Sequence, residues 1–310
     1  MSSPAFLGAF GSTESQYSYY EIFIHPFVRD AEIIIAATIG YFVVQFATMA
    51  MMPYISLAYR KLSKTDQQNF AIRVVSIVNG FVMFNSAFIF LDELRRNNWT
   101  LHDRHYEEIP GYRPYRLMIV GYFLWDLLVC VGYRWGAMWT IHAIVSFLGT
   151  YFLAFPFSDQ YAAYYTGMFE TSNAFIHSAA LLKMLKIHLG LASLLEYIFA
   201  GLFFFIRVLG GTFVTLSWYV DMVPRLLAGR GHSHFTIAVC LLSVAVVMVL
   251  QYVWFWEIVK IATGRGDAPS VVSSDSNDDD KKATNGSSST SATSPASTTT
   301  RRRGAAPKVE

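Results

Sequence analysis

The stretch Phe235–Trp256, FTIAVCLLSVAVVMVLQYVWFW, decides the fold, because it is apolar and long enough to cross a bilayer as a helix. Six other apolar stretches precede it, each near the ~20 residues that a spanning helix needs, and the shorter ones require tilt or bundle packing. The seven predicted spans are Ile33–Leu57, Phe70–Leu91, Leu117–Val131, Met138–Phe155, Tyr161–Leu182, Leu191–Leu209 and Phe235–Trp256. The sequence therefore predicts an all-α membrane protein with about seven transmembrane helices.

The composition agrees with this prediction. Hydrophobic residues make up 54% of the chain and charged residues only 15%, which excludes a soluble enzyme. The net charge of +2 comes from scattered Lys and Arg with no basic stripe among aromatics, so we expect no nucleic-acid partner. Cys130 and Cys240 fall within predicted spans and are interpreted as small buried side chains.

The two ends of the chain lie outside the predicted bundle. Residues 1–32 lack a basic region followed by an apolar one, and the aromatic run from Tyr17 is typical of an interfacial segment. The first transmembrane helix, residues 33–57, is expected to act as a signal anchor. Residues 264–310 are rich in Ser, Thr, Ala and Asp and too polar to bury a core, so we predict a disordered tail.

A single motif favours one orientation in the membrane. Lys and Arg are divided equally between the two sets of loops and choose neither side. Asn98-Trp99-Thr100 is a glycosylation sequon in the longest loop, which favours placing Asn98 in the lumen. The Ser/Thr-rich tail would then be cytosolic.

Ionisable side chains stand inside four successive spans. They are Asp126, His142, Glu170 and Arg207. Because such a group costs a few kcal/mol in a membrane, it usually faces the bundle interior and marks a partner or a substrate path. One interpretation is that these groups only pair with one another and fix the helix register. The other is a lipid-facing site in which His142 is a general base tuned by Asp126 or Glu170, while Arg207 holds an anionic head group.

The order of these elements resembles the TLC-domain family, named for translocating-chain-associated, longevity-assurance and ceroid-lipofuscinosis membrane proteins. The resemblance rests on motifs in consecutive helices and extends over residues 70–256, with the first span outside it. The motifs are Tyr122-Phe-Leu-Trp-Asp126, Trp139-Thr-Ile-His142 with Ser146, Glu170-Thr-Ser172-Asn173, and Phe203 to Arg207.

The resemblance implies an endoplasmic-reticulum or related endomembrane protein, built from about six helices that form a barrel-like bundle around a lipid-accessible cavity. Ceramide synthases of this family carry a His-His pair and a downstream signature of adjacent Asp residues. Here the second position is Ala143, and no such signature follows Arg207. The departure favours the branch whose members affect phospholipid acyl composition and lipid homeostasis.

We therefore predict a lipid acyltransferase-like protein. Its catalytic residues are His142 and Asp126, and its substrate-binding residues are Glu170, Ser172, Asn173 and Arg207. Membrane lipids are the expected partners, acyl-CoA is the expected co-substrate, and no bound cofactor is expected. The alternative hypothesis is a non-catalytic lipid-binding, trafficking or translocon-associated protein, motivated by Ala143.

A metal site is not expected. Clustered histidines at repeated short spacing would be needed, and only His102 with His105 and His232 with His234 are close in sequence. Both pairs fall in predicted loops and are interpreted as solvated loop histidines.

Overall fold

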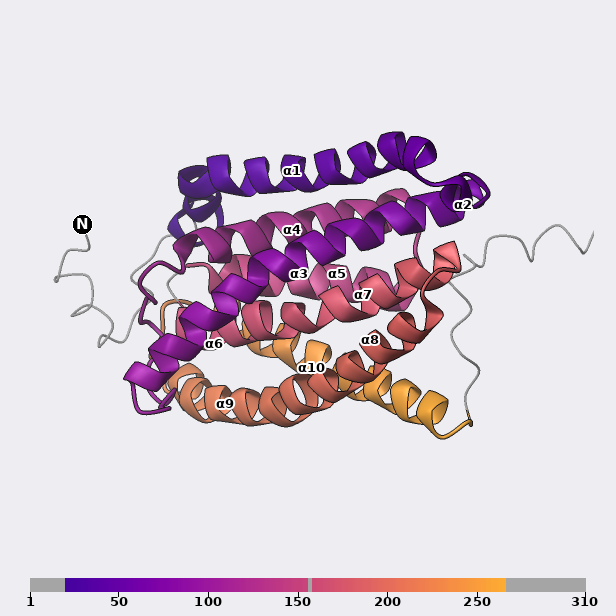
Figure 1. Cartoon of the computed structure of the whole chain (residues 1–310). Coiled ribbons are helices and arrows are strands. Elements are labelled where there is room, and N and C mark those ends of the chain that lie inside the picture. The colour runs from indigo at the N-terminus through magenta and orange to yellow at the C-terminus, as the bar shows by residue number, and fades with distance from the viewer. Residues whose placement is uncertain (1–19, 156–157, 266–310) are drawn as a thin grey trace, which may run out of the picture. The chain divides into compact units, whose positions relative to one another are not determined.

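The structure is a computed structural model that describes residues 20–155 and 158–265, and the described residues form helices joined by short connections, without a strand (Figure 1). Here α marks an α-helix and η a π-helical segment. The elements are η2 Tyr20–Ile24, α1 His25–Ile55, α2 Leu57–Arg60, α3 Lys64–Arg96, α4 Arg113–Gly132, α5 Ala137–Leu153, α6 Asp159–Ala163, η3 Tyr164–Met168, α7 Phe169–Leu185, α8 Leu189–Leu202, η4 Phe203–Gly210, α9 Gly211–Leu227 and α10 His234–Ala262.

The prediction of an all-α protein with several spans is confirmed. Five helical rods are long and apolar enough to cross a membrane: Tyr20–Ile55, Lys64–Arg96, Arg113–Gly132, Leu189–Leu227 and His234–Ala262. Of the other two predicted spans, one corresponds to α5, which is apolar but shorter. The other corresponds to the consecutive segments α6, η3 and α7, which carry several polar side chains and do not reach the apolarity of the five.

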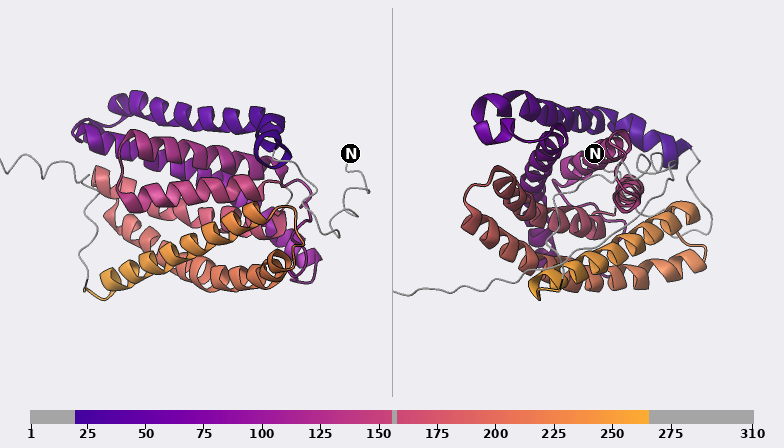
Figure 2. Two further views of the ribbon diagram at one scale, coloured as in Figure 1. Left: turned by 180° about the vertical axis from the view of Figure 1, so that it is seen from behind. Right: turned by 90° about the vertical axis from the view of Figure 1, so that its right-hand side faces the viewer.

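The rods form a ring in which α3 and α4 pack only loosely against each other, and α1 covers the boundary between them. Neighbours around the ring are α3, α7, the α8–η4–α9 rod, α10, α5 and α4, and α3 touches α4 only briefly. Helix α1 packs along both α4 and α3, and Figure 2 shows it lying over these two helices. Thr38 of α1 donates a hydrogen bond to the carbonyl of Gly121 on α4 at 3.0 Å, and a Cβ at Gly121 would stand 2.7 Å from that of Ala37. The small residues thus allow a close helix approach.

The ring has two ends, named here the loop end and the Lys64 end. At the loop end, residues 97–112 connect α3 to α4, and at the Lys64 end α3 begins and α10 ends (Figure 1). The loop is part of the core, since Leu101, Ile109 and Tyr112 are buried and pack with Trp218 and Met222 of α9. Asn98, the sequon residue, is exposed just beyond α3, and its glycosylation stays a prediction.

The interpretation of the loop histidines as solvated is wrong for two of the four. His105 and His232 are only 2% and 5% exposed, because their rings stack on each other and His105 also stacks on Trp218. His102 and His234 are exposed, as predicted.

The ends of the chain differ from the predicted boundaries in one respect. Helix α1 begins at His25 rather than at Ile33, so part of the predicted interfacial segment is helical. Asp30 is buried in this first part and forms ion pairs with Arg29 and Arg113, which compensates its charge. The predicted tail lies outside the described residues from position 266 onward.

Candidate functional site

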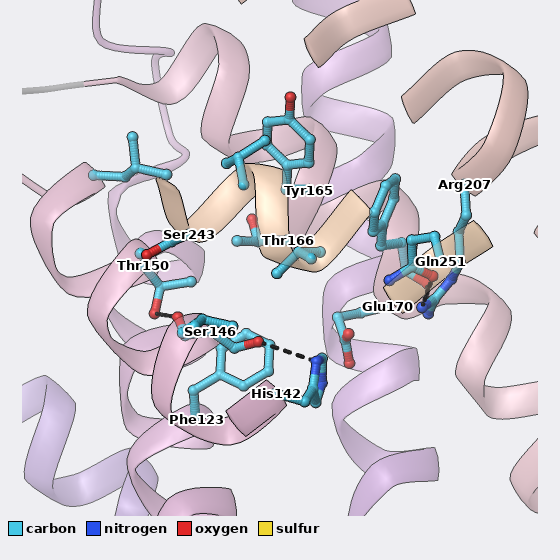
Figure 3. A pocket seen from close by; sticks show the side chains of 16 residues that line it. Phe123, His142, Ser146, Thr150, Tyr165, Thr166, Glu170, Arg207, Ser243 and Gln251 are labelled. Carbon is cyan, nitrogen blue, oxygen red and sulfur yellow. Dashed lines mark hydrogen bonds between the residues drawn. The ribbon is translucent and has the colours of Figure 1, made fainter. Parts of the chain in front are cut away.

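A cavity runs between α4, α5, the η3–α7 rod, η4 and α10, with about 530 Å³ of empty space, part of it open to the surroundings. Its wall is mostly apolar. His142 and Leu153 of α5 both line it, and their spacing corresponds to about 16 Å along the helix axis, so the cavity is elongated. The polar side chains His142, Glu170, Arg207 and Gln251 gather in one region of it (Figure 3). An elongated apolar cavity with polar groups in one region fits an amphipathic ligand.

His142 lies in this cavity with one polar contact. Its Nδ1 is 3.5 Å from the hydroxyl of Ser146 one turn along α5, at the limit of a hydrogen bond. The ring contacts Phe123 and Trp254 edge-on, with centroid distances of 6.3 Å and 5.3 Å. Aromatic neighbours therefore hold the imidazole, and no carboxylate among the described residues forms an ion pair with it.

Asp126, the other predicted catalytic residue, does not line the cavity. It is half-buried on α4 and makes no hydrogen bond or ion pair with any described residue. The structure thus places Asp126 and His142 on adjacent helices without bringing the carboxylate to the imidazole.

Arg207 is held by four hydrogen bonds from its guanidinium, although it is only 5% exposed. Nε donates to the Ser172 hydroxyl at 3.0 Å, and Nη1 donates to Oε1 of Gln251 at 3.2 Å. Nη2 donates to the Phe169 carbonyl at 2.5 Å and to Oδ1 of Asn173 at 2.7 Å. Since a guanidinium has five N–H donors, one of those on Nη1 stays uncommitted.

Glu170 is also held by neutral groups rather than by a cation. Its Oε2 accepts hydrogen bonds from the side-chain amides of Asn79 at 2.9 Å and Asn173 at 3.1 Å. Asn79 in turn accepts from the Tyr41 hydroxyl at 2.9 Å. One polar network thus crosses the ring from α1 through α3 and α7 to Arg207.

Predicted and observed site residues overlap in part. Glu170, Ser172, Asn173 and Arg207 do come together, with Glu170 and Arg207 joined through Asn173. Sequence reasoning missed three buried members of the network: Tyr41, Asn79 and Gln251. The available signal was the amide side chains of Asn79 and Gln251 inside otherwise apolar stretches.

Two π-helical segments shape the cavity wall. Thr166 belongs to η3 and Arg207 to η4, and both line the cavity. The segments meet where the Tyr164 hydroxyl donates to the Ile206 carbonyl at 2.7 Å, beside Gly210. A Cβ on Gly210 would collide with that hydroxyl, so the Tyr164 side chain would have to shift. Short π-helical insertions re-aim side chains and are frequent at functional sites.

Ala143, which stands where ceramide synthases carry a second histidine, is fully buried and does not line the cavity. No group of three or more His, Cys, Asp or Glu residues suited to a metal ion occurs within residues 20–155 and 158–265. The polar chemistry of the cavity therefore centres on His142, Glu170 and Arg207.

These observations define a multi-pass membrane protein with a polar network beside an intramembrane cavity. The TLC domain model, named for the TRAM, LAG1 and CLN8 proteins, matches residues 69–260, and the chain belongs to this family. TLC domain proteins are membrane proteins linked to lipid metabolism and homeostasis. No curated protein matches the chain.

Proposed function

We propose that the protein sets lipid acyl composition in the endoplasmic reticulum or a related endomembrane, by transferring an acyl group to a phospholipid or a sphingolipid. The observation that carries the proposal is the elongated apolar cavity with His142, Glu170 and Arg207 in one region. An acyl chain would lie along the apolar wall, and the reacting head would meet His142.

The proposed reaction needs one base and one acyl donor. A lipid hydroxyl or amine attacks the thioester carbonyl of acyl-CoA, and His142 accepts the proton that this group loses. The carbon–sulfur bond then breaks, and the departing CoA thiolate takes up the proton from His142. The remaining Nη1 hydrogen of Arg207 is available to an anionic oxygen of the substrate. His142 lies near the start of α5 at the Lys64 end, which is the cytosolic side if Asn98 is lumenal.

The test combines a deletion strain with purified protein. In the deletion strain, the wild-type chain is expected to restore the lipid acyl profile, and His142→Ala is expected not to. Acyl transfer by the purified variant should be lower than that of wild type by about 10²-fold or more. His234→Ala is the matched control, because His234 is exposed at the loop end. A normal lipid profile with His142→Ala at normal abundance would refute the catalytic role.

A second candidate is a non-catalytic lipid-binding, trafficking or translocon-associated protein. Two observations favour it: no carboxylate in the described part of the chain orients His142, and Arg207 and Glu170 are satisfied by neutral partners. In this case the purified protein retains a lipid without turning it over, and His142→Ala leaves the lipid profile unchanged. Acyl transfer by the pure wild-type protein would exclude this candidate.

A further inference from the structure

Gln251 is an amide inside the apolar helix α10, and only one end of this amide is bound. The side chain is 1% exposed and lines the cavity. Its Oε1 accepts a hydrogen bond from Nη1 of Arg207 at 3.2 Å. Because a guanidinium only donates, this bond determines which end of the amide faces Arg207 and leaves Nε2 on the other side. Nε2 carries two N–H donors, and it donates to no described residue.

A second buried glutamine shows how an amide with a structural role is bound in this ring. Gln45 of α1 is also 1% exposed, but both ends of its amide have a partner. Its Oε1 accepts from the indole N–H of Trp125 at 2.9 Å, and its Nε2 donates to the hydroxyl of Tyr133 at 3.2 Å. Because an N–H group in such a place is costly without a partner, the free nitrogen of Gln251 indicates that a ligand supplies the acceptor.

Gln251 is placed close to both Arg207 and His142. Trp254 is three residues further along α10, so it lies one turn from Gln251 on the same face. Its ring contacts the imidazole of His142 edge-on, with centroids 5.3 Å apart. Figure 3 shows Gln251 beside Arg207, in the region of the cavity where Glu170 and His142 also lie. The free N–H groups are therefore available where the reacting head of a ligand would meet His142.

The neighbours of Gln251 indicate what kind of acceptor fits. Glu170, the carboxylate on the cavity wall, accepts from Asn79 and Asn173 and not from Gln251. A neutral amide donor next to the Arg207 cation suits an oxygen that is neutral when it binds and gains negative charge during a reaction. The carbonyl oxygen of an acyl group under nucleophilic attack is such an oxygen, and Gln side chains serve as donors to it in acyl transfer.

We propose that Gln251 is a catalytic residue that binds the carbonyl oxygen of the acyl thioester through Nε2–H, and this inference rests on the proposed acyl transfer. When the lipid hydroxyl or amine attacks the carbonyl carbon, one electron pair of the C=O bond moves onto this oxygen. Gln251 and the charge of Arg207 stabilise the oxygen in that state. The pair returns as the carbon–sulfur bond breaks, and the proton passes through His142 to the departing thiolate. The acyl chain then extends along the apolar wall toward Leu153.

The test compares two ligands that differ only in the carbonyl oxygen. The probes are oleoyl coenzyme A and its thioether, S-oleyl coenzyme A, in which a methylene group replaces the carbonyl. Binding to the purified full chain in detergent is measured by native mass spectrometry, and wild type is expected to bind the thioester about fivefold more tightly. Gln251→Glu keeps the oxygen that Arg207 binds but loses the N–H donors, so it should bind the two probes about equally.

Acyl transfer is measured on the same preparations. Gln251→Glu is expected to lower kcat by about 10²-fold or more, because a donor to the developing charge is lost, while KM for oleoyl coenzyme A rises about fivefold at most. Gln68→Glu makes the same change near the start of α3, outside the cavity. It is the matched control and should keep both the wild-type kcat and the preference for the thioester.

The outcomes separate a catalytic Gln251 from a structural one. If Gln251 only holds Arg207, Gln251→Glu keeps the probe preference and kcat of wild type, and either result would overturn the proposal, as would equal binding of the probes by wild type. Gln251→Met lacks the donors without adding a charge, should also lose the preference, and serves if Gln251→Glu fails to fold. If wild type transfers no acyl group, the proposed function fails, whereas the probe preference still decides whether Gln251 binds the carbonyl.

Discussion

The polar groups at the loop end and those beside the cavity are used in opposite ways. We call Arg116, Asp159, His105, Trp218 and His232 the loop-end cluster, and His142, Glu170, Arg207 and Gln251 the cavity cluster. The loop-end cluster lies among packed side chains of the core, and its members bind one another. Glu170 and Arg207 form hydrogen bonds to neutral groups, and Gln251 accepts one from Arg207. His142 keeps a single polar contact at 3.5 Å.

Within the loop-end cluster, the Asp159 carboxylate is fully buried yet well bound. Both of its oxygens accept from Nη1 of Arg116, at 2.6 Å and 2.7 Å, and one accepts from the backbone N–H of Ile109 at 3.0 Å. Arg116 also pairs with Glu108 at 2.9 Å. This pairing ties the loop to α4 and α6, which makes it a stabilising contact.

His105 shows how completely this cluster is determined. The indole N–H of Trp218 donates to Nδ1 of His105 at 2.9 Å, and because an indole only donates, the imidazole hydrogen must be on Nε2. Nε2 then donates to the Ser158 hydroxyl at 3.2 Å. His105 is thus fixed in one neutral form, whereas nothing comparable fixes His142. Polar groups whose hydrogen-bond donors and acceptors are all occupied indicate a stabilising role. Those with an unoccupied donor or acceptor indicate binding or chemistry.

The largest effect is expected at Asp159. Asp159→Asn removes the charge that compensates Arg116, and losing one partner of a buried ion pair costs about 3 to 5 kcal/mol of unfolding free energy. The melting temperature and the cellular abundance should both fall strongly. Asp92→Asn is the control, because Asp92 pairs with Arg95 and Arg96 at the surface, and it should melt like wild type. Equal melting of the two variants would show that the loop-end cluster does not hold the fold.

The second largest effect is a loss of stability at acidic pH, caused by the histidines of the loop-end cluster. Burial, together with nearby His232 and Arg225, holds the pKa of His105 well below its usual 6.5, and burial lowers the pKa of His232 to about 3. Because the unfolded chain takes up these protons first, stability is full above pH 6.5 and is lost as the pH falls toward the folded values.

For two such histidines the loss at about pH 5.5 is about 3 kcal/mol. Melting curves between about pH 7.5 and pH 5.5 check it, and His232→Gln should remove about half of the slope. His234→Gln is the control and should leave the slope unchanged, since His234 is exposed and forms no ion pair with a described residue. A slope that His232→Gln does not reduce would assign the pH dependence to other groups.

A smaller effect is expected in the cavity cluster. Arg207→Lys keeps the charge, but an ammonium has three donors in place of the four hydrogen bonds that the guanidinium makes. We expect a loss of about 2 kcal/mol, the value of one charge-assisted hydrogen bond. Melting in detergent measures it, with Arg96→Lys as an exposed control. A loss as large as that of Asp159→Asn would mean that the cavity cluster is as structural as the loop end.

The sequence predicts the spans and much of the cavity cluster for a physical reason. Apolar length determines a spanning helix, and an isolated charge such as Arg207 inside one must face a partner. The gathering of Glu170, Ser172, Asn173 and Arg207 follows from this rule together with helical spacing. The part played by Asn79 was not predicted, because a single amide is only weakly distinguished from an inert polar residue.

The loop end could not be predicted because its contacts join residues far apart in the sequence. His105 reads as a loop histidine until Trp218 and His232 are placed beside it, which only the folded ring does. Asp126 shows the converse, since its position in a span suggests a partner for His142 but leaves the direction of its side chain undetermined. Such contacts depend on the rotation of each helix about its own axis. The periodicity of the sequence does not determine that rotation to within part of a turn.

The smallest effect is expected from removing the single hydrogen bond between Trp218 and His105 while keeping the packing around it. Trp218→Phe keeps most of the aromatic packing against His105 but removes the N–H that donates to Nδ1, so we expect a loss of about 1 kcal/mol. Trp99→Phe is the control, because Trp99 is 64% exposed and should melt like wild type. Without the indole N–H the hydrogen of His105 is free to move to Nδ1, so nitrogen-15 NMR of labelled histidine should report a mixture of tautomers. An unchanged tautomer would show that the Ser158 contact alone fixes His105, and the indole bond would then be unnecessary to the order of the loop-end cluster.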